Sequence, residues 1–231
     1  MAQIPSRFGP SQLASSTPAE SCEAVSIADP QRLVYTVYMP TKTRIIQASR
    51  KLFDEKGLEE LSLRNVAKRV GITPMAIYRH FDSKEALVDA LVLDGLAQWS
   101  ARVDALPQAE GLAKIEQISE AFLDFALEEP RRFEAAFLIH STKARRYPDD
   151  FVAGRSPAGT IQLKAIEQAM ADGVLEAHSA IEIMMTNTAL GQGLVTLYRA
   201  GRIAGGEAAF RKLYRRATRR LIDSFKTGKA K

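Results

Sequence analysis

The sequence predicts an all-α fold. From Thr41 onward the apolar residues recur at the i, i+3, i+4, i+7 spacing of one helix face, and no run alternates with the period of two that marks a half-buried strand. Three short helices are expected within residues 42–81, with only Gly71, Ile72 and Thr73 between the second and the third. This spacing is typical of a helix-turn-helix unit.

Length and composition narrow the class further. The 231 residues, of which 46% are hydrophobic, suffice for one large domain or two small ones. The single cysteine, Cys22, excludes an intramolecular disulfide and a zinc cluster built on cysteines. The three histidines show no paired ligand spacing, so no metal and no cofactor are expected. The residues show neither a signal-peptide pattern nor an apolar stretch long enough to span a membrane, and we expect a cytoplasmic protein without a membrane partner.

Charge is distributed unevenly along the chain. The net charge is +5 over residues 41–84, −6 over residues 85–205 and +7 over residues 206–231. Basic segments suit polyanions such as nucleic acid, although a solvated helix face is the commoner cause of a charge run. The arginines of residues 206–231 can also form ion pairs with the acidic middle of the chain. For these arginines we favour ion pairing or solvation over contact with DNA.

The elements follow in order. Residues 1–40 are rich in Ser, Pro, Ala and Gln, and we expect a mostly disordered arm. The first helix has an apolar face that includes Ile45, Leu52 and Phe53, and Gly57 can end it as a left-handed cap.

The next three helices have N-caps that can be read from the sequence. Ser62 can cap the second helix, Thr73 the third with Pro74 at its first position, and Ser83 the fourth. Phe81 ends the third helix. Further helices are expected near 111–128, 131–143, 160–172, 179–200 and 206–225, with a loop over 147–159.

From Thr41 to Leu87 the chain resembles the DNA-binding domain of TetR-family transcriptional regulators. The resemblance rests on RIIQASRKLFDEKGLEELSLRNVAKRVGITPMAIYRHFDSKEAL, residues 44–87, whose many motif positions agree in order and spacing. It implies three domains: the arm, a helix-turn-helix DNA-binding domain over residues 41–87, and a helical ligand-binding and dimerisation domain over residues 88–231. A double-stranded DNA operator, an unidentified small-molecule effector and a second copy of the chain are the implied partners.

The resemblance also implies residue roles. The start of the recognition helix would reach base edges, Arg79 a base or a phosphate, and the remaining positions phosphates. The implied DNA-binding residues are Lys42, Arg44, Ser62, Arg64, Thr73, Pro74, Met75, Ala76, Tyr78, Arg79, His80 and Lys84.

The C-terminal helices offer candidates for a pocket and for a dimer interface. A pocket needs an apolar lining with a few polar groups, and most such residues in any protein are simply core. The pocket candidates are Phe122, Phe125, Phe133, Phe137, Met184, Met185, Asn187, Thr188 and Gln192. Small and apolar residues on the last two helices suggest a four-helix interface across a two-fold axis, or else ordinary core. The interface candidates are Gly191, Val195, Leu213, Tyr214, Ala217 and Leu221.

These observations predict a regulator rather than an enzyme. The sequence has no glycine-rich phosphate loop, no nucleophile elbow and no catalytic residues that we would assign. The leading hypothesis is a ligand-responsive repressor that binds its operator as a dimer and is released by a small molecule. An activator of the same family and a helical interaction module without DNA binding are the alternatives.

Overall fold

The structure is a computed structural model that describes residues 39–228. Within that range every regular element is a helix, apart from one isolated β-bridge between Leu175 and Lys226, so the all-α prediction is confirmed. Nearly all of the predicted N-terminal arm lies outside the described residues. No helix between residues 39 and 228 is long and apolar enough to cross a membrane.

The first three helices are α1 (Thr41–Lys56), α2 (Leu63–Val70) and α3 (Pro74–Tyr78). The second and third of them begin where their caps predict. The Ser62 hydroxyl accepts from the Asn65 N–H at 3.1 Å, and the Thr73 hydroxyl accepts from the Ala76 N–H at 3.2 Å. Gly57 ends α1 with φ +77° and ψ −173°, so its φ is positive but it is not the left-handed cap that we predicted.

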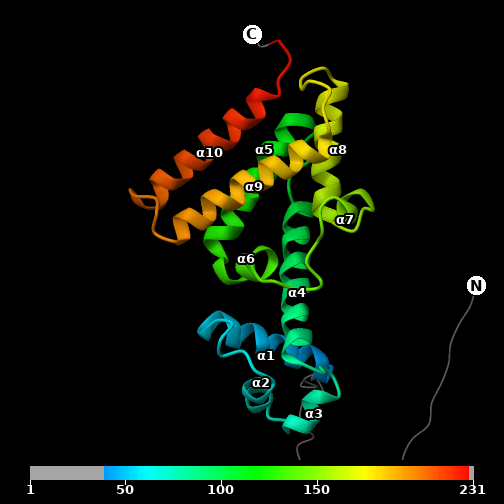
Figure 1. The fold of residues 1–231 in the computed structure, drawn as a ribbon, viewed down its shortest axis with the longest axis vertical. Coiled ribbons are helices and arrows are strands. Elements are labelled where there is room, and N and C mark those ends of the chain that lie inside the picture. Colours follow the sequence, from blue (N-terminus) through cyan, green and yellow to red (C-terminus); the bar gives the residue numbers. More distant parts are fainter. Residues whose placement is uncertain (1–38, 229–231) are drawn as a thin grey trace, which may run out of the picture. The chain divides into compact units, whose positions relative to one another are not determined.

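One apolar core joins these helices to the start of α4 (Lys84–Asp104) (Figure 1). The Ser83 hydroxyl accepts from the Ala86 N–H at 3.2 Å and so begins α4. The fully buried side chains of this core include Leu61, which precedes α2, and residues of all four helices: Ile45, Phe53, Val66, Ile77, Leu87 and Val92. Because α4 is the longest helix and continues beyond this core, it leads from the three-helix unit into the remaining helices.

The C-terminal helices pack around the second half of α4. They are α5 (Gly111–Glu128), α6 (Pro130–Phe137), α7 (Asp149–Val152), α8 (Pro157–Ala171), α9 (Ala180–Arg199) and α10 (Gly206–Ser224). Helices α9 and α10 run side by side, and both contact α5 (Figure 1). A central aromatic cluster fills the space among α4, α5 and α6, with Trp99 and Phe122 in edge contact at 5.5 Å between ring centroids.

Three of the predicted boundaries were wrong. Helix α3 ends at Tyr78 rather than at Phe81, and α6 ends at Phe137 rather than near 143. After α6 the Ser141 hydroxyl donates to Asp89 and accepts from the Lys143 N–H, and these bonds hold a turn instead of a further helical turn. The expected loop over 147–159 contains α7 and the first residues of α8, whose start is capped by Ser156.

Candidate nucleic-acid interface and internal cavity

The turn between α2 and α3 holds α3 at the surface. Gly71 adopts a left-handed conformation, φ +75° and ψ +36°, which a side chain would strain. The N–H groups of Gly71 and Ile72 both donate to the Ala67 carbonyl at 3.0 Å. Ile77 is fully buried and anchors the inner face of α3 to the core.

The outer face of α3 is open to solvent. Met75 is 73% exposed and Tyr78 is 51% exposed, which is unusual for large apolar side chains. Thr73, Pro74, Arg79 and His80 are also exposed, and Ala76 is half-buried. The predicted recognition residues therefore lie together on one accessible segment, a geometry that can enter a DNA major groove.

Basic side chains flank this segment on neighbouring elements. Lys84 is exposed at the start of α4 and donates to the Leu58 carbonyl at 3.2 Å, while Arg44 on α1 donates to the Val70 carbonyl at 3.0 Å. Lys42 and Arg64 are exposed, and half-buried Ser62 has its oxygen engaged in the helix cap. Backbone carbonyls leave the positive charges uncompensated, so these side chains remain suited to phosphate.

The sequence reasoning missed Lys68, which is exposed on α2 and lines a shallow groove with Arg64, Ile72 and Pro74. Its spacing of four residues from Arg64 was the available signal, since residues i and i+4 share a helix face. Arg69 is another basic residue of α2, but it forms an ion pair with Glu55, so its charge is less available for a phosphate.

A cavity of about 220 Å³ lies among α4, α5, α6, α8 and α9. Seven of the nine predicted pocket residues line it: Phe122, Phe137, Met184, Met185, Asn187, Thr188 and Gln192. Phe125 and Phe133 do not, because their rings fill the adjacent core and are 1% and 0% exposed. The sequence reasoning missed Trp99 and Gln162, of which Gln162 was detectable as a polar residue among apolar ones in its helix.

Few polar groups of the cavity are fully paired. The Asn187 amide donates to the Ser119 hydroxyl at 3.1 Å, but the Asn187 Oδ1 atom is buried without a hydrogen-bond partner. Gln192 donates a long bond to the Phe137 carbonyl at 3.4 Å. Burial raises the pKa of Tyr214, whose side chain also lines the cavity, so its hydroxyl stays protonated.

Half of the predicted dimer residues face the interior of the chain's own fold. Val195 and Tyr214 are 0% and 2% exposed, and Gly191 is buried against the Tyr214 hydroxyl. For these three residues the burial favours the alternative of ordinary core over an interface. Leu213, Ala217 and Leu221 lie half-buried on the outer side of α10.

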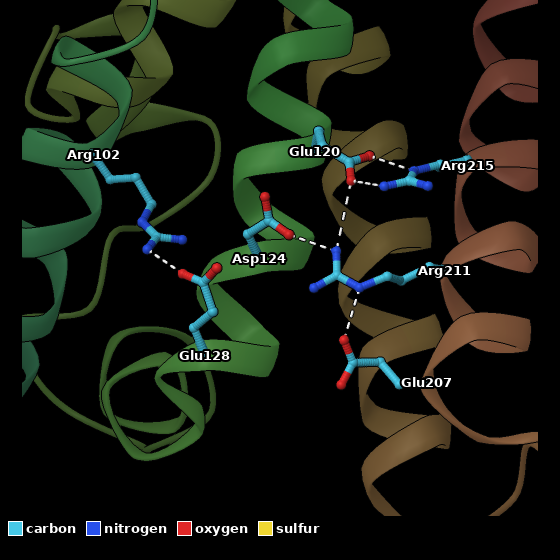
Figure 2. A network of polar contacts seen from close by, with 7 residues as sticks. All are labelled: Arg102, Glu120, Asp124, Glu128, Glu207, Arg211 and Arg215. Atoms are coloured by element: carbon cyan, nitrogen blue, oxygen red, sulfur yellow. Dashed lines mark hydrogen bonds and ion pairs between the residues drawn. The ribbon is translucent and has the colours of Figure 1, made fainter.

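Arg211 and Arg215 of α10 pair with acidic residues of α5 (Figure 2). Arg211 contacts Asp124 at 2.5 Å and Glu207 at 2.8 Å, and the hydrogen bond to Asp124, followed by that to Glu207, raises the pKa of Arg211. The Arg215 Nε–H donates to Glu120 at 2.8 Å. The expected pairing with the acidic middle of the chain is therefore present for Arg211 and Arg215, whereas Arg216 and Arg220 are exposed and make no hydrogen bond or ion pair within residues 39–228.

The helix-turn-helix unit, its exposed third helix and the attached helical bundle define a DNA-binding transcriptional regulator of the helix-turn-helix class. Two family models match the chain: "Bacterial regulatory proteins, tetR family" over residues 45–91 and "Tetracyclin repressor-like, C-terminal domain" over residues 115–221. The protein belongs to the TetR family, whose members are DNA-binding regulators and not enzymes.

Individual relatives are distant. The chain is 26% identical over 114 residues to the uncharacterised regulator YobS of Bacillus subtilis, covering 48% of this chain and 60% of YobS. It is 28% identical over 166 residues to the class A tetracycline repressor protein of transposon 1721 from Escherichia coli, covering 71% and 69% of the two chains. The crystal structure of a TetR variant from Acinetobacter baumannii in complex with minocycline superposes with a TM-score of 0.57 and 21% identity, covering 81% and 96%.

Proposed function

We propose that the protein is a ligand-responsive repressor that binds an operator as a homodimer in the cytoplasm and leaves it when a small molecule fills the cavity. The main support for this proposal is that α4 extends from the recognition segment to the cavity. Its first residue, Lys84, follows the recognition segment by a short turn, and its second half supplies Leu96 and Trp99 to the cavity. One rigid helix therefore joins the two sites.

Helix α6 packs against α4 beside the cavity. Ala136 and Phe137 of α6 line the cavity, and the Ala136 backbone approaches α4 at Gly95, where an added Cβ would lie 3.1 Å from the Ala136 nitrogen. A ligand that fills the cavity contacts Leu96 and Trp99 of α4 and Phe137 of α6 at once, and it would therefore shift α4 and α6 together. The spacing of the two recognition helices in a dimer, about 34 Å on DNA, would then no longer fit successive major grooves. The ligand shifts the equilibrium by its different affinity for the two forms.

The dimer would form through the outer faces of α9 and α10. Leu197 is 49% exposed, and Leu194, Leu213, Ala217 and Leu221 are half-buried. Gly193 has no other atom within 4 Å of where its Cβ would stand, so a partner helix can approach closely there. Exposed apolar side chains on two adjacent helices favour a self-complementary contact across a two-fold axis. A small-molecule effector is also in keeping with the Acinetobacter baumannii protein of similar fold, whose crystal structure is a complex with minocycline.

The proposal is tested by selecting DNA fragments that the purified protein binds from a random pool, then measuring binding to the enriched site with and without candidate ligands. We expect one enriched sequence with inverted half-sites and its release by some compounds. Failure to enrich any sequence would refute DNA regulation by this chain, and enrichment without release by any cavity-binding compound would refute the ligand response.

A further inference from the structure

The cavity contains one charged side chain. Its lining includes no aspartate and no glutamate, and Arg145, from the segment between α6 and α7, is the single ionisable group with a formal charge. The polar neighbours are amides and hydroxyls, which carry no net charge. Because opposite charges attract and like charges repel more strongly away from bulk water, this lining favours an anion and disfavours a cation.

Arg145 is half-buried, and within residues 39–228 its guanidinium makes no hydrogen bond and no ion pair. Its acidic neighbour, Asp150, is already engaged by the Arg146 N–H at 2.7 Å and by the Arg155 Nε–H at 2.6 Å. Those bonds hold the pKa of the Asp150 carboxyl below its usual value, so Asp150 stays charged and occupied. The positive charge of Arg145 is only the last of the contributions that lower the pKa of Asp150, and its planar guanidinium makes no hydrogen bond in the part of the chain that the structure describes. Such a group matches a ligand carboxylate, to which it can donate two parallel hydrogen bonds.

Asn187 provides a second and independent requirement. The residue is 6% exposed, its amide nitrogen is paired with Ser119, and its Oδ1 atom has no donor. Buried acceptors are rarely left without a partner, because an unpaired one loses its hydrogen bonds to water without replacing them. A ligand with a hydroxyl or N–H group would satisfy this atom.

The rest of the lining describes the body of the ligand. The large apolar side chains of the wall include the rings of Trp99, Phe122, Phe137 and Phe151 and the thioethers of Met184 and Met185. The volume of about 220 Å³ lies below the range of about 300 to 1,000 Å³ usual for drug-sized ligands. A flat and compact apolar body, such as a single aromatic ring, fits such a space and packs favourably against aromatic side chains.

We propose that the effector is a small aromatic carboxylic acid with a hydroxyl or N–H substituent, whose carboxylate pairs with Arg145 and whose substituent donates to Asn187. This inference rests on the proposed function, because it treats the cavity as the effector site.

The test measures direct binding to the full chain by isothermal titration calorimetry. The anionic probes are 4-hydroxybenzoate, 3-hydroxybenzoate and 4-hydroxyphenylacetate, which vary the spacing between the two polar groups. The matched probes are 4-hydroxybenzamide, which removes the charge, and benzoate, which removes the donor. We expect the best hydroxy acid to bind at least ten-fold more tightly than its amide and several-fold more tightly than benzoate.

Variants assign these preferences to residues. Arg145→Gln should reduce the ten-fold preference for the acid over the amide to less than two-fold, whereas Arg146→Gln, an exposed neighbour outside the cavity lining, should retain it. Asn187→Ser keeps a polar side chain but withdraws the Oδ1 atom, and it should remove the preference over benzoate. An unchanged melting temperature shows that each variant is folded.

Three results would overturn the inference: equal affinity for acid and amide in the wild type, an acid preference that survives Arg145→Gln, or no binding of any of the three acids at millimolar concentration. Operator binding measured in parallel separates this inference from the proposed function. An acid that binds through Arg145 but leaves operator affinity unchanged supports the ligand class and refutes ligand-controlled release. Release by neutral aromatic compounds alone supports the proposed function and refutes the carboxylate.

Discussion

At the scale of single residues, the exposed basic side chains around α3 make few contacts that would stabilise the fold. Lys84 makes one exposed bond to the Leu58 carbonyl, and Arg64 has no hydrogen bond or ion pair within residues 39–228. Surface hydrogen bonds of this kind stabilise a fold weakly. Phosphate binding is the stronger reason for such side chains to cluster beside an exposed recognition segment.

Substitution of Lys84 tests this assignment. In Lys84→Ala we expect weaker binding to every DNA sequence and a salt dependence of log K that is smaller by about one unit, because one phosphate contact releases about one counterion. Fluorescence anisotropy at several salt concentrations measures the slope. Lys164→Ala, an exposed lysine on α8, is the matched control. A slope that is the same in Lys84→Ala and in the control would rule out the phosphate role.

Asp89 controls the position of the segment that carries Arg145. The Ser141 hydroxyl, at 2.6 Å, and the Thr142 hydroxyl, at 2.8 Å, donate to its carboxylate, and the bond from Ser141 is the main reason that the pKa of Asp89 lies below its usual value. A carboxyl whose pKa is lowered by folding stabilises the protein above its unfolded pKa of 3.8 and loses that contribution as the pH falls through the folded pKa.

We expect the melting temperatures of the wild type and Asp89→Asn to differ by an amount that depends on pH. The variant should melt at a lower temperature above about pH 4, by an amount that corresponds to about 1 kcal/mol for hydrogen bonds to a partly exposed charge. The difference should shrink as the pH decreases below 3.8. Differential scanning calorimetry between pH 3 and pH 7 measures it, with Asp104→Asn as the control. A constant difference across that range would contradict the assigned role of the charge.

At the scale of helices, the crossing of α4 and α6 depends on one small residue. An added Cβ at Gly95 would lie 3.1 Å from the Ala136 nitrogen and 3.1 Å from the Arg132 carbonyl oxygen. Backbone atoms cannot move as side-chain ends do, so the two helices would have to separate. The crossing is also the place where the cavity and the helix-turn-helix unit meet, and a change there should affect both sites.

Gly95→Ala should therefore destabilise the fold by about 1 to 3 kcal/mol through overpacking, although alanine is the better helix former. It should also weaken operator binding, because the start of α4 carries the recognition unit. Urea unfolding and anisotropy titrations measure the two effects. Ala101→Ser, at an exposed α4 position, should change neither. Higher stability in Gly95→Ala would show that the crossing has room for a methyl group.

The α5–α10 ion-pair network is the second feature at this scale. Arg211 lies between Asp124 and Glu207, with Glu120 at 3.7 Å, and is mostly buried by them (Figure 2). Removing its charge leaves Asp124 and Glu207 without their cation, whereas Glu120 keeps its bond from Arg215. We expect Arg211→Gln to lower the free energy of unfolding by about 1 to 2 kcal/mol, less than for a fully buried pair because the group is partly exposed.

The same variant should leave operator affinity unchanged, because the network lies on the C-terminal helices. Chemical unfolding and anisotropy give the two readouts, and Arg216→Gln, an exposed arginine of the same helix, is the control for charge alone. A loss of DNA affinity in Arg211→Gln at unchanged stability would place α10 in the DNA interface instead.

At the scale of the whole molecule, the sequence predicted best where local chemistry decides the structure. Ser62, Thr73 and Ser83 cap their helices as predicted, and Ile77 and Phe81 are buried, because capping and periodicity depend on neighbours in the chain. It predicted less well where partners are distant. Phe125 and Phe133 share the periodicity of Phe122 and Phe137, but the positions of α4 and α6 decide which rings reach the cavity. Arg145 lies in a segment without periodicity, and no local signal distinguished it from Arg146.

The proposed dimer depends on this same distinction between inner and outer faces. Val195 and Tyr214 pack in the core of their own chain. The apolar side chains on the outer sides of α9 and α10 are therefore the ones that remain available to join two copies. Leu197→Glu places a charge on that outer side, at a position that is already 49% exposed and therefore costs the single subunit little. Between two copies the same charge would be buried without a partner, at a cost of several kcal/mol.

We therefore expect the wild type to be a dimer and Leu197→Glu to be a folded monomer at micromolar concentration, as measured by sedimentation or light scattering. Its operator affinity should decrease by two orders of magnitude or more, because two linked recognition helices bind with a high effective concentration that single ones lack. Leu93→Glu is the matched control, since Leu93 is 42% exposed on α4, and it should remain dimeric. If Leu197→Glu stays dimeric while Leu93→Glu dissociates, the interface involves α4, and the two recognition helices are held together at a different face from the one inferred here.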